Sequence, residues 1–244
     1  MQEGAGQEGA GTTAASVDAA EVARFDALAA RWWDPSGPMR PLHRMNPARI
    51  GWIEARIRRR FGAAPVRVLD LGCGAGLAAE ALARHGHAVL GLDAAGAAIA
   101  AARAHAAGCG LDLDYREGTA EALVAEGQRF PVVLALEVIE HVADIGAFLA
   151  TLAQLVEPGG LVFLSTLNRT RRAFLFAKLG AEYVLRLLPA GTHDWQRFVT
   201  PAELAAALGA AGLRLADSAG LIPGLGGWRV GRDLAVNYIV CAEA

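Results

Sequence analysis

The chain has 244 residues, a mass of 25.4 kDa and 54% hydrophobic residues, which suffices for one well-buried domain with an elaboration. Its formal net charge of −2 and its pI near 6.3 leave no basic field of the kind that binds nucleic acid, so we expect no nucleic-acid partner. The three cysteines, Cys73, Cys109 and Cys241, are odd in number and widely spaced. Their spacing argues against a disulfide framework and a zinc site, and it fits the cytoplasm.

The N-terminal region divides into a tail and a helical cap. Residues 1–15 are rich in Gly, Ala, Gln and Glu and lack the basic start and apolar core of a signal peptide, so they are predicted to be a disordered tail. Residues 16–62 are predicted to form two helices. The first ends near Trp33, and the second opens with Asn46 as N-cap and Pro47 at the first helical position. No apolar run approaches the roughly 20 residues that span a bilayer.

The rest of the chain alternates strands with alanine-rich helices, as α/β proteins do. We therefore predict one domain over residues 16–244, built on a mostly parallel sheet. The order of the strands cannot be derived from the pattern alone. The predicted strands lie near 66–71, 88–92, 111–115, 131–136, 160–166, 213–221 and 234–241.

A glycine-rich turn follows the first of these strands. Gly72, Gly74 and Gly76 leave room for a ligand against the main chain, and the helix that follows directs its N-terminal N–H groups at that ligand. The spacing G-x-G-x-G differs from the dinucleotide fingerprint G-x-G-x-x-G, and no phosphate-loop Lys-Ser/Thr follows. This spacing disfavours an NAD-dependent oxidoreductase. The alternative interpretation is a turn that only packs strand on helix.

Asp93 ends the second predicted strand, 21 residues past Gly72, where a ribose-binding acid belongs in a βαβ unit. Together, Leu69-Asp-Leu-Gly-Cys-Gly-Ala-Gly76 and Gly91-Leu-Asp93 resemble two motifs of the class I S-adenosylmethionine (SAM)-dependent methyltransferases. In that family the glycine loop holds the methionine portion of SAM and the acid holds the ribose. The resemblance assigns five residues to cofactor binding: Asp70, Gly72, Gly74, Gly76 and Asp93.

An acidic cluster follows the fourth predicted strand. Glu137, Glu140 and His141 stand at i, i+3 and i+4, so they would converge on one point if the chain turns helical there. Two carboxylates and an imidazole suit Mg²⁺, which would help a phenol hydroxyl to ionise. Two alternatives remain open: His141 acts as a metal-free general base, or the cluster is structural and the acid at the strand end only touches the cofactor.

Several further segments narrow the family. They are Arg31-Trp-Trp-Asp-Pro-Ser-Gly37, Pro41-Leu-His-Arg-Met-Asn-Pro-Ala-Arg49, Ser165-Thr-Leu-Asn-Arg169, 180–194 and Asp233-x-x-x-Asn-Tyr238. With these segments the chain closely resembles the ubiquinone biosynthesis O-methyltransferases over about residues 20 to 241. The resemblance implies a doubly wound, Rossmann-like, seven-stranded sheet of order 3-2-1-4-5-7-6 with an antiparallel seventh strand. It also matches Arg49 to the SAM carboxylate and Leu136 to a cofactor contact, and it places magnesium on Glu137, Glu140 and His141.

The implied reaction moves the SAM methyl group to a ring hydroxyl of a polyprenylated phenol, on 2-polyprenyl-6-hydroxyphenol and on 3-demethylubiquinol. The alternatives are another phenolic or lipophilic acceptor, or a non-catalytic SAM-binding scaffold in a biosynthetic complex. The apolar tail of such a substrate suggests a role for residues 168–198, a predicted helical insertion that is basic and amphipathic. Residues 168–190 are expected either to lie at the inner face of the cytoplasmic membrane or to act only as a lid.

Overall fold

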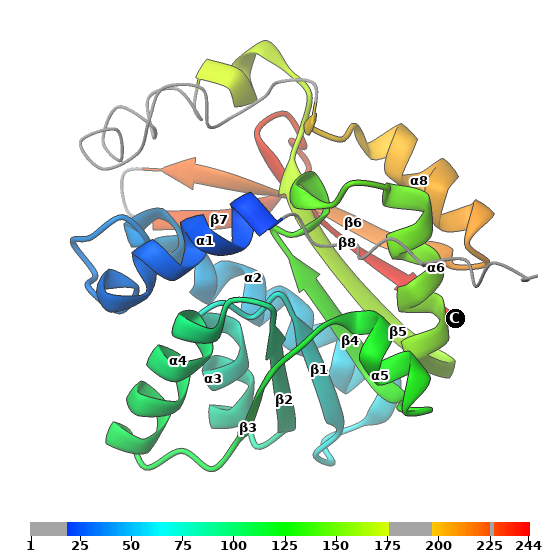
Figure 1. Ribbon diagram of the computed structural model, residues 1–244. Helices are drawn as coiled ribbons and strands as arrows, with labels where there is room; N and C mark the ends of the chain where they lie inside the picture. The colour runs from blue at the N-terminus through cyan, green and yellow to red at the C-terminus, as the bar shows by residue number, and fades with distance from the viewer. Residues whose placement is uncertain (1–18, 176–196, 225–226) are drawn as a thin grey trace, which may run out of the picture.

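The computed structural model describes residues 19–175, 197–224 and 227–244 (Figure 1). The predicted tail over 1–15 and most of the predicted insertion lie outside these ranges. Among the described residues, no helix combines the length and apolar character needed to cross a bilayer.

The core is one eight-stranded sheet of order β3-β2-β1-β4-β5-β8-β6-β7 (Figure 1). The first five strands in this order are parallel, and β8 lies antiparallel between β5 and β6. The doubly wound fold and the implied strand order are therefore confirmed, with β8 in the place of the seventh strand. The strands are β1 (Arg67–Leu71), β2 (Ala88–Asp93), β3 (Asp114–Glu117), β4 (Phe130–Leu136), β5 (Val156–Leu167), β6 (Arg214–Gly224), β7 (Gly227–Gly231) and β8 (Asn237–Glu243).

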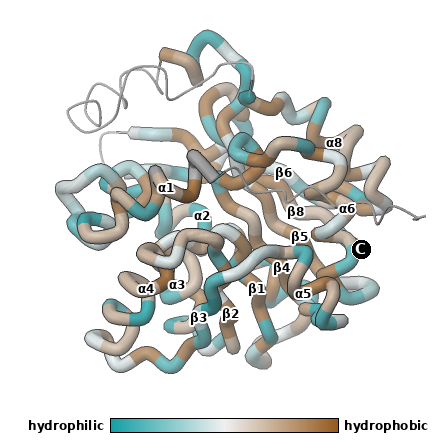
Figure 2. Tube along the Cα trace, viewed as in Figure 1, coloured by the Kyte–Doolittle hydropathy of each residue, from teal (hydrophilic) through white to brown (hydrophobic). Residues whose placement is uncertain are grey.

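Helices cover both faces of the sheet, and the central strands, which are largely hydrophobic (Figure 2), supply side chains to both faces. In β4, Val132 and Leu134 pack with α2, α3 and α4, whereas Val133 and Ala135 pack with α5, α6 and α8. The central strands are apolar at consecutive positions because neither face meets water. The helical elements are α1 (Ala19–Leu28), η1 (Ala29–Arg31), α2 (Arg40–Phe61), α3 (Leu77–Arg84), α4 (Gly96–Gly108), α5 (Ala120–Ala125), η2 (Ile139–His141), α6 (Ile145–Leu155) and α8 (Pro201–Ala210).

Two predictions about the elements were wrong. The second helix does not start at Asn46: α2 begins at Arg40, with a proline in its first turn, and continues through Pro47. Asn46 instead uses its side-chain amide to donate to the Leu77 carbonyl oxygen at 2.8 Å, which ties α2 to the start of α3. The sheet also has an eighth strand, β7, which pairs antiparallel with β6 and forms the edge of the sheet.

Gly91→Ala is expected to lower the free energy of unfolding by about 1–3 kcal/mol through overpacking. A Cβ at Gly91 would lie 2.5 Å from the Tyr115 ring and 3.0 Å from Cys73 Sγ, and both neighbours are buried. Urea unfolding provides the measurement. Gly108→Ala is the matched control, because a Cβ there meets nothing within 4 Å at the end of α4. Equal unfolding midpoints for the two variants would contradict the packing argument.

Candidate active site

A cavity of about 350 Å³ opens at the carboxyl ends of β1, β2 and β4, which is where doubly wound sheets bind ligands. Nine of the ten residues predicted for the site line it; Gly76 does not. The rest of the lining includes residues of the α1–η1 region, the start of α2, the start of α3, the segment after β3 and the turn after β4. The nine residues are Arg49, Asp70, Gly72, Gly74, Asp93, Leu136, Glu137, Glu140 and His141.

Side chains from other parts of the chain pack closely against the glycine loop after β1. Gly72, Gly74 and Gly76 have φ of 70°, 53° and 91°, a region that favours glycine. A Cβ at Gly74 would lie 2.2 Å from the indole of Trp32, which covers the loop and lines the cavity. A Cβ at Gly76 would instead lie 2.0 Å from the Tyr115 hydroxyl oxygen. Gly72 and Gly74 therefore border the cavity, and Gly76 serves the packing of α3 against β3.

Asp93, at the end of β2, is held by the loops on both sides of it. Its Oδ2 accepts from the backbone N–H of Gly74 at 2.7 Å, and its Oδ1 accepts from that of Ala95 at 2.9 Å. Burial raises the pKa of Asp93, and these backbone hydrogen bonds oppose the rise. The carboxylate thus fixes the shape of the glycine loop while it lines the cavity.

Arg49 and Asp70 place opposite charges in the same wall. Both residues are buried, with exposures of 4% and 2%. Burial raises the pKa of Asp70 to about 7, and the charge of Arg49 opposes this rise. Arg49 Nε donates to Asn46 Oδ1 at 2.9 Å, while Asp70 Oδ2 has no hydrogen-bond partner among the described residues. A buried guanidinium and a buried carboxylate with an open acceptor fit the carboxylate and ammonium groups of an amino acid.

Glu137 belongs to the strand end rather than to a helix. Its backbone N–H donates to the Ser165 carbonyl oxygen at 2.9 Å, which extends the pairing of β4 with β5. Its φ of 57° is rare for a residue with a side chain and turns the carboxylate toward β5 and β8. There Oε1 accepts from Ser165 Oγ at 2.6 Å and Oε2 accepts from Asn237 Nδ2 at 2.8 Å. A helical turn through all three residues, the condition for their convergence, is not present, because η2 begins only at Ile139.

Glu140 and His141 lie on η2, and both line the cavity. Glu140 is buried, and its Oε2 accepts from Thr166 Oγ1 at 2.8 Å. Burial, followed by the charge of Glu137, raises the pKa of Glu140 to about 7. The His141 ring meets Phe25 edge to face, with centroids 5.5 Å apart. Glu140 is therefore a carboxyl group that can both hold and release a proton near neutrality.

The three predicted magnesium ligands do not form a compact ligand set in this arrangement. Within the described ranges, the group of acid, histidine and cysteine ligand atoms that comes together within 4.8 Å is Glu80, His105 and Cys109. Glu137, Glu140 and His141 share one wall, but the bonds from Ser165 and Asn237 hold Glu137 at the strand end. As placed, these residues do not fit a metal ion held by all three, and the magnesium site stays a prediction.

The sequence did not single out the partners of these acids as functional residues. Ser165 and Thr166 on β5 and Asn237 on β8 are buried and contact Glu137 or Glu140. All three fall in segments noted above as unusual, Ser165-Thr-Leu-Asn-Arg169 and Asp233-x-x-x-Asn-Tyr238. Polar side chains within otherwise apolar strands were the signal that would have found them.

Comparison with known proteins identifies the family of this chain. A family model described as "Methyltransferase domain" matches residues 42–218. The "Ubiquinone biosynthesis O-methyltransferase" of Azorhizobium caulinodans is 50% identical over 93% of this chain and 93% of that protein. The protein of the same name from Methylobacterium nodulans is 52% identical over 93% of this chain and 95% of its own. The chain belongs to the ubiquinone biosynthesis O-methyltransferase family.

It is therefore a SAM-dependent O-methyltransferase with the class I fold. Among solved structures, magnesium protoporphyrin IX methyltransferase from Synechocystis PCC 6803, solved with bound SAM, superposes with a TM-score of 0.63. It is 18% identical and covers 95% of this chain and 99% of that chain, so this likeness supports the fold alone.

Proposed function

We propose that the cavity transfers the SAM methyl group to ring hydroxyls of two intermediates of ubiquinone biosynthesis, 2-polyprenyl-6-hydroxyphenol and 3-demethylubiquinol. One observation supports the proposal: the same cavity is lined by the charged pair Arg49 and Asp70 and by the carboxyl and imidazole groups of Glu140 and His141. The first pair suits an amino-acid moiety, and the second suits an acceptor that must lose a proton.

The hydrogen-bond donors and acceptors of the cavity wall indicate which end of the cavity binds the cofactor. Arg49 is proposed to bind the carboxylate of the methionine portion, and the open Oδ2 of Asp70 is proposed to accept from its ammonium group. Gly72 and Gly74 allow the ligand to approach the main chain, and Leu136 adds an apolar contact. Asp93 is proposed to accept from the ribose hydroxyls. When bound, SAM supplies an electrophilic methyl group on its sulfonium.

At the acceptor end, the residues must remove a phenol proton. An unperturbed phenol has a pKa of about 10, so little phenolate exists at neutral pH without help. His141 is proposed to accept this proton, with Glu140 beside it to stabilise the imidazolium that forms. Thr166 donates to Glu140 and holds it in place. Ser165 and Asn237 do the same for Glu137, which adds negative charge to the same wall.

The test is transfer of labelled methyl from SAM to a short-chain prenyl catechol, with EDTA and with added Mg²⁺ as separate arms. Labelled methyl ether, absent from a boiled-enzyme control, is the expected product. Product that disappears with EDTA and returns with Mg²⁺ would support the predicted metal at Glu137, Glu140 and His141. Product formation that is unchanged by EDTA would favour His141 as a metal-free base. Tight SAM binding without product would point to another acceptor or to a non-catalytic scaffold.

SAM binding is expected to weaken as the pH falls below about 7. Burial raises the pKa of Asp70 to about 7 in the ligand-free enzyme, whereas a bound ammonium group would favour the carboxylate and lower that pKa. Binding below this pH therefore requires Asp70 to release a proton, and the affinity falls by up to about tenfold per pH unit. Calorimetry in buffers of different ionisation enthalpy measures the released proton. Asp70→Asn should bind more weakly and without this dependence, and an unchanged slope would contradict the assignment.

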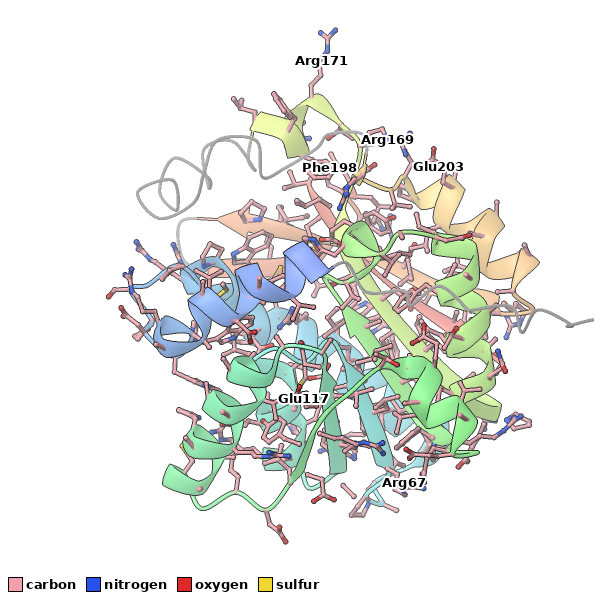
Figure 3. The ribbon with its side chains drawn as sticks, viewed as in Figure 1. Arg67, Glu117, Arg169, Arg171, Phe198 and Glu203 are labelled. Atoms are coloured by element: carbon pink, nitrogen blue, oxygen red, sulfur yellow. The ribbon has the colours of Figure 1, made fainter. Side chains whose placement is uncertain are left out.

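We also propose that the segment after β5 contacts the membrane surface, where a polyprenyl tail would lie. Residues 171–175 are helical, and Phe174 and Leu175 are 42% and 58% exposed. Arg171 points away from the body of the molecule, whereas Arg169 turns back to Glu203 on α8 (Figure 3). The same apolar and basic surface also suits a lid. Other residues of the predicted insertion, including Lys178, lie outside the described ranges.

Flotation with anionic liposomes tests this contact. The wild type is expected to float, and changing Arg171, Arg172 and Lys178 together to Glu is expected to abolish flotation, because the segment would then repel anionic lipid. Arg59→Glu, an exposed change on α2, serves as the control. A wild type that stays at the bottom of the gradient, or a triple variant that still floats, would contradict membrane contact by this segment. The segment would then be interpreted as a lid.

A further inference from the structure

Three potential metal ligands gather near the glycine loop, and none of them is among the residues that line the cavity. Glu80 lies on α3, His105 lies in the last turn of α4, and Cys109 follows that helix. His105 Nδ1 is 2.7 Å from Glu80 Oε1, and Cys109 Sγ is 3.9 Å from each nitrogen of the His105 ring. One ligand atom from each residue lies within 4.8 Å of the others.

The spacing of the cysteines did not reveal this cluster. His105 and Cys109 stand four residues apart, which places both side chains on one face at the end of α4. The third ligand comes from α3, which lies beside α4 because both helices cover the same face of the sheet. The three cysteines alone are too widely spaced to share a zinc ion, whereas this set contains one cysteine, one histidine and one acid.

Neighbouring residues orient two of the three ligands, and the third is open to solvent, from which a cation could enter. Glu80 is completely buried, with its second oxygen accepting from Arg84 at 2.8 Å, so the carboxylate is held in one orientation. Cys109 is exposed and leaves an entry path. The indole of Trp33 stacks flat on the His105 ring, with centroids 3.4 Å apart and planes 3° apart. Two of the three ligands are therefore oriented before any ion arrives.

We propose that Glu80, His105 and Cys109 bind one Zn²⁺-type transition-metal ion. A thiolate with an imidazole and a carboxylate is a donor set for borderline ions such as Zn²⁺ and is poorly suited to Mg²⁺. Zinc–ligand bonds of about 2.0–2.3 Å require Glu80 Oε1 and His105 Nδ1 to move apart somewhat to admit the ion. The Cys109 thiol releases its proton to the buffer, His105 binds as neutral imidazole, and water completes the tetrahedron.

The site is joined to the glycine loop through Trp33. The Trp33 indole N–H donates to the Ala75 carbonyl oxygen at 3.0 Å while its ring rests on His105. Glu80 lies one turn after Gly76, whose carbonyl oxygen accepts from the Glu80 backbone N–H at 2.9 Å. A metal ion here would therefore join α3, α4 and the Trp33 segment around the loop. Because the ion binds only the folded chain, it raises the melting temperature.

The test is titration of the metal-free, full-length protein with Co²⁺, in a large excess of Mg²⁺ and with a non-thiol reductant. Co²⁺ occupies Zn²⁺ sites, and a cobalt–thiolate bond adds a near-ultraviolet charge-transfer band. The wild type is expected to bind one Co²⁺ per chain with this band, to lose the band when Zn²⁺ is added, and to lose Trp33 fluorescence. Zn²⁺ alone is expected to raise the melting temperature.

Two variants at the exposed Cys109 separate ligation from folding. Cys109→Ser is expected to abolish the band and weaken Co²⁺ binding at least about tenfold, because a thiolate ligand is lost. Cys109→His is expected to retain binding without the band. His85→Asn, at an exposed histidine after α3, is the matched control and should behave as wild type. A wild type without the band, a band that survives Cys109→Ser, or one ion per two chains would overturn the proposal.

Discussion

Asp93→Ala is expected to weaken SAM binding by at least about 100-fold, near 3 kcal/mol. Under the proposed assignment the variant loses two things at once. The ribose hydroxyls lose their acceptor, and Gly74 loses the carboxylate that fixes its backbone N–H at 2.7 Å. Asp93→Asn is expected to fall between the variant and wild type, because one amide oxygen remains to accept. Isothermal titration calorimetry measures all three affinities directly.

Asp112→Ala provides the matched control for this experiment. Asp112 is an exposed aspartate in the loop before β3 and is not among the residues that line the cavity. Its loss should leave the affinity unchanged. An Asp93→Ala enzyme that binds SAM within about threefold of wild type would show that Asp93 neither shapes the loop nor holds the cofactor.

Glu140→Gln is expected to lower kcat by about 10²–10⁴-fold while SAM affinity changes little. The amide keeps the size of the side chain and an oxygen that can accept from Thr166, but it carries no charge to stabilise a protonated His141. Glu140→Ala is expected to lose at least as much turnover. Single-turnover methyl transfer at saturating SAM gives the rate, and calorimetry gives the affinity.

Two comparisons make the Glu140 result interpretable. Glu126→Gln removes an exposed carboxylate that pairs with Arg116 outside the cavity, and it should retain full activity. Thr166→Val removes only the donor that holds Glu140, so a smaller loss is expected. Full activity in Glu140→Gln would remove Glu140 from the mechanism, and a parallel loss of SAM binding would move its role to the cofactor.

The features of the active site that follow from local spacing were predicted from the sequence. A buried strand that runs into Gly72 and Gly74, with Asp93 at the end of the next strand, specifies a βαβ unit and the edge at which it binds a ligand. The alternation of strands and helices likewise predicted the sheet. Nine of the ten predicted residues line one cavity, and those at the ends of β1, β2 and β4 meet there because parallel strands end at the same edge.

Tertiary contacts decided what residue spacing could not. Glu137, Glu140 and His141 do not share one helical turn, because Glu137 pairs its backbone with β5 and its carboxylate with Asn237, 100 residues away. Asn46, predicted as a helix cap, instead hydrogen-bonds to the start of α3. In each case a polar group found a partner distant in the chain, and buried hydrogen bonds outweigh the modest preferences of a local motif.

The amino-acid sequence by itself determined the family, the doubly wound fold and nine of the residues that line the cavity, because these depend on patterns a few residues long. Only the tertiary structure decided how the acids are held, that Gly76 serves packing, and that Glu80 meets His105 and Cys109. Those outcomes depend on which elements pack together and on burial, which makes each unpaired polar group costly and so selects its partner.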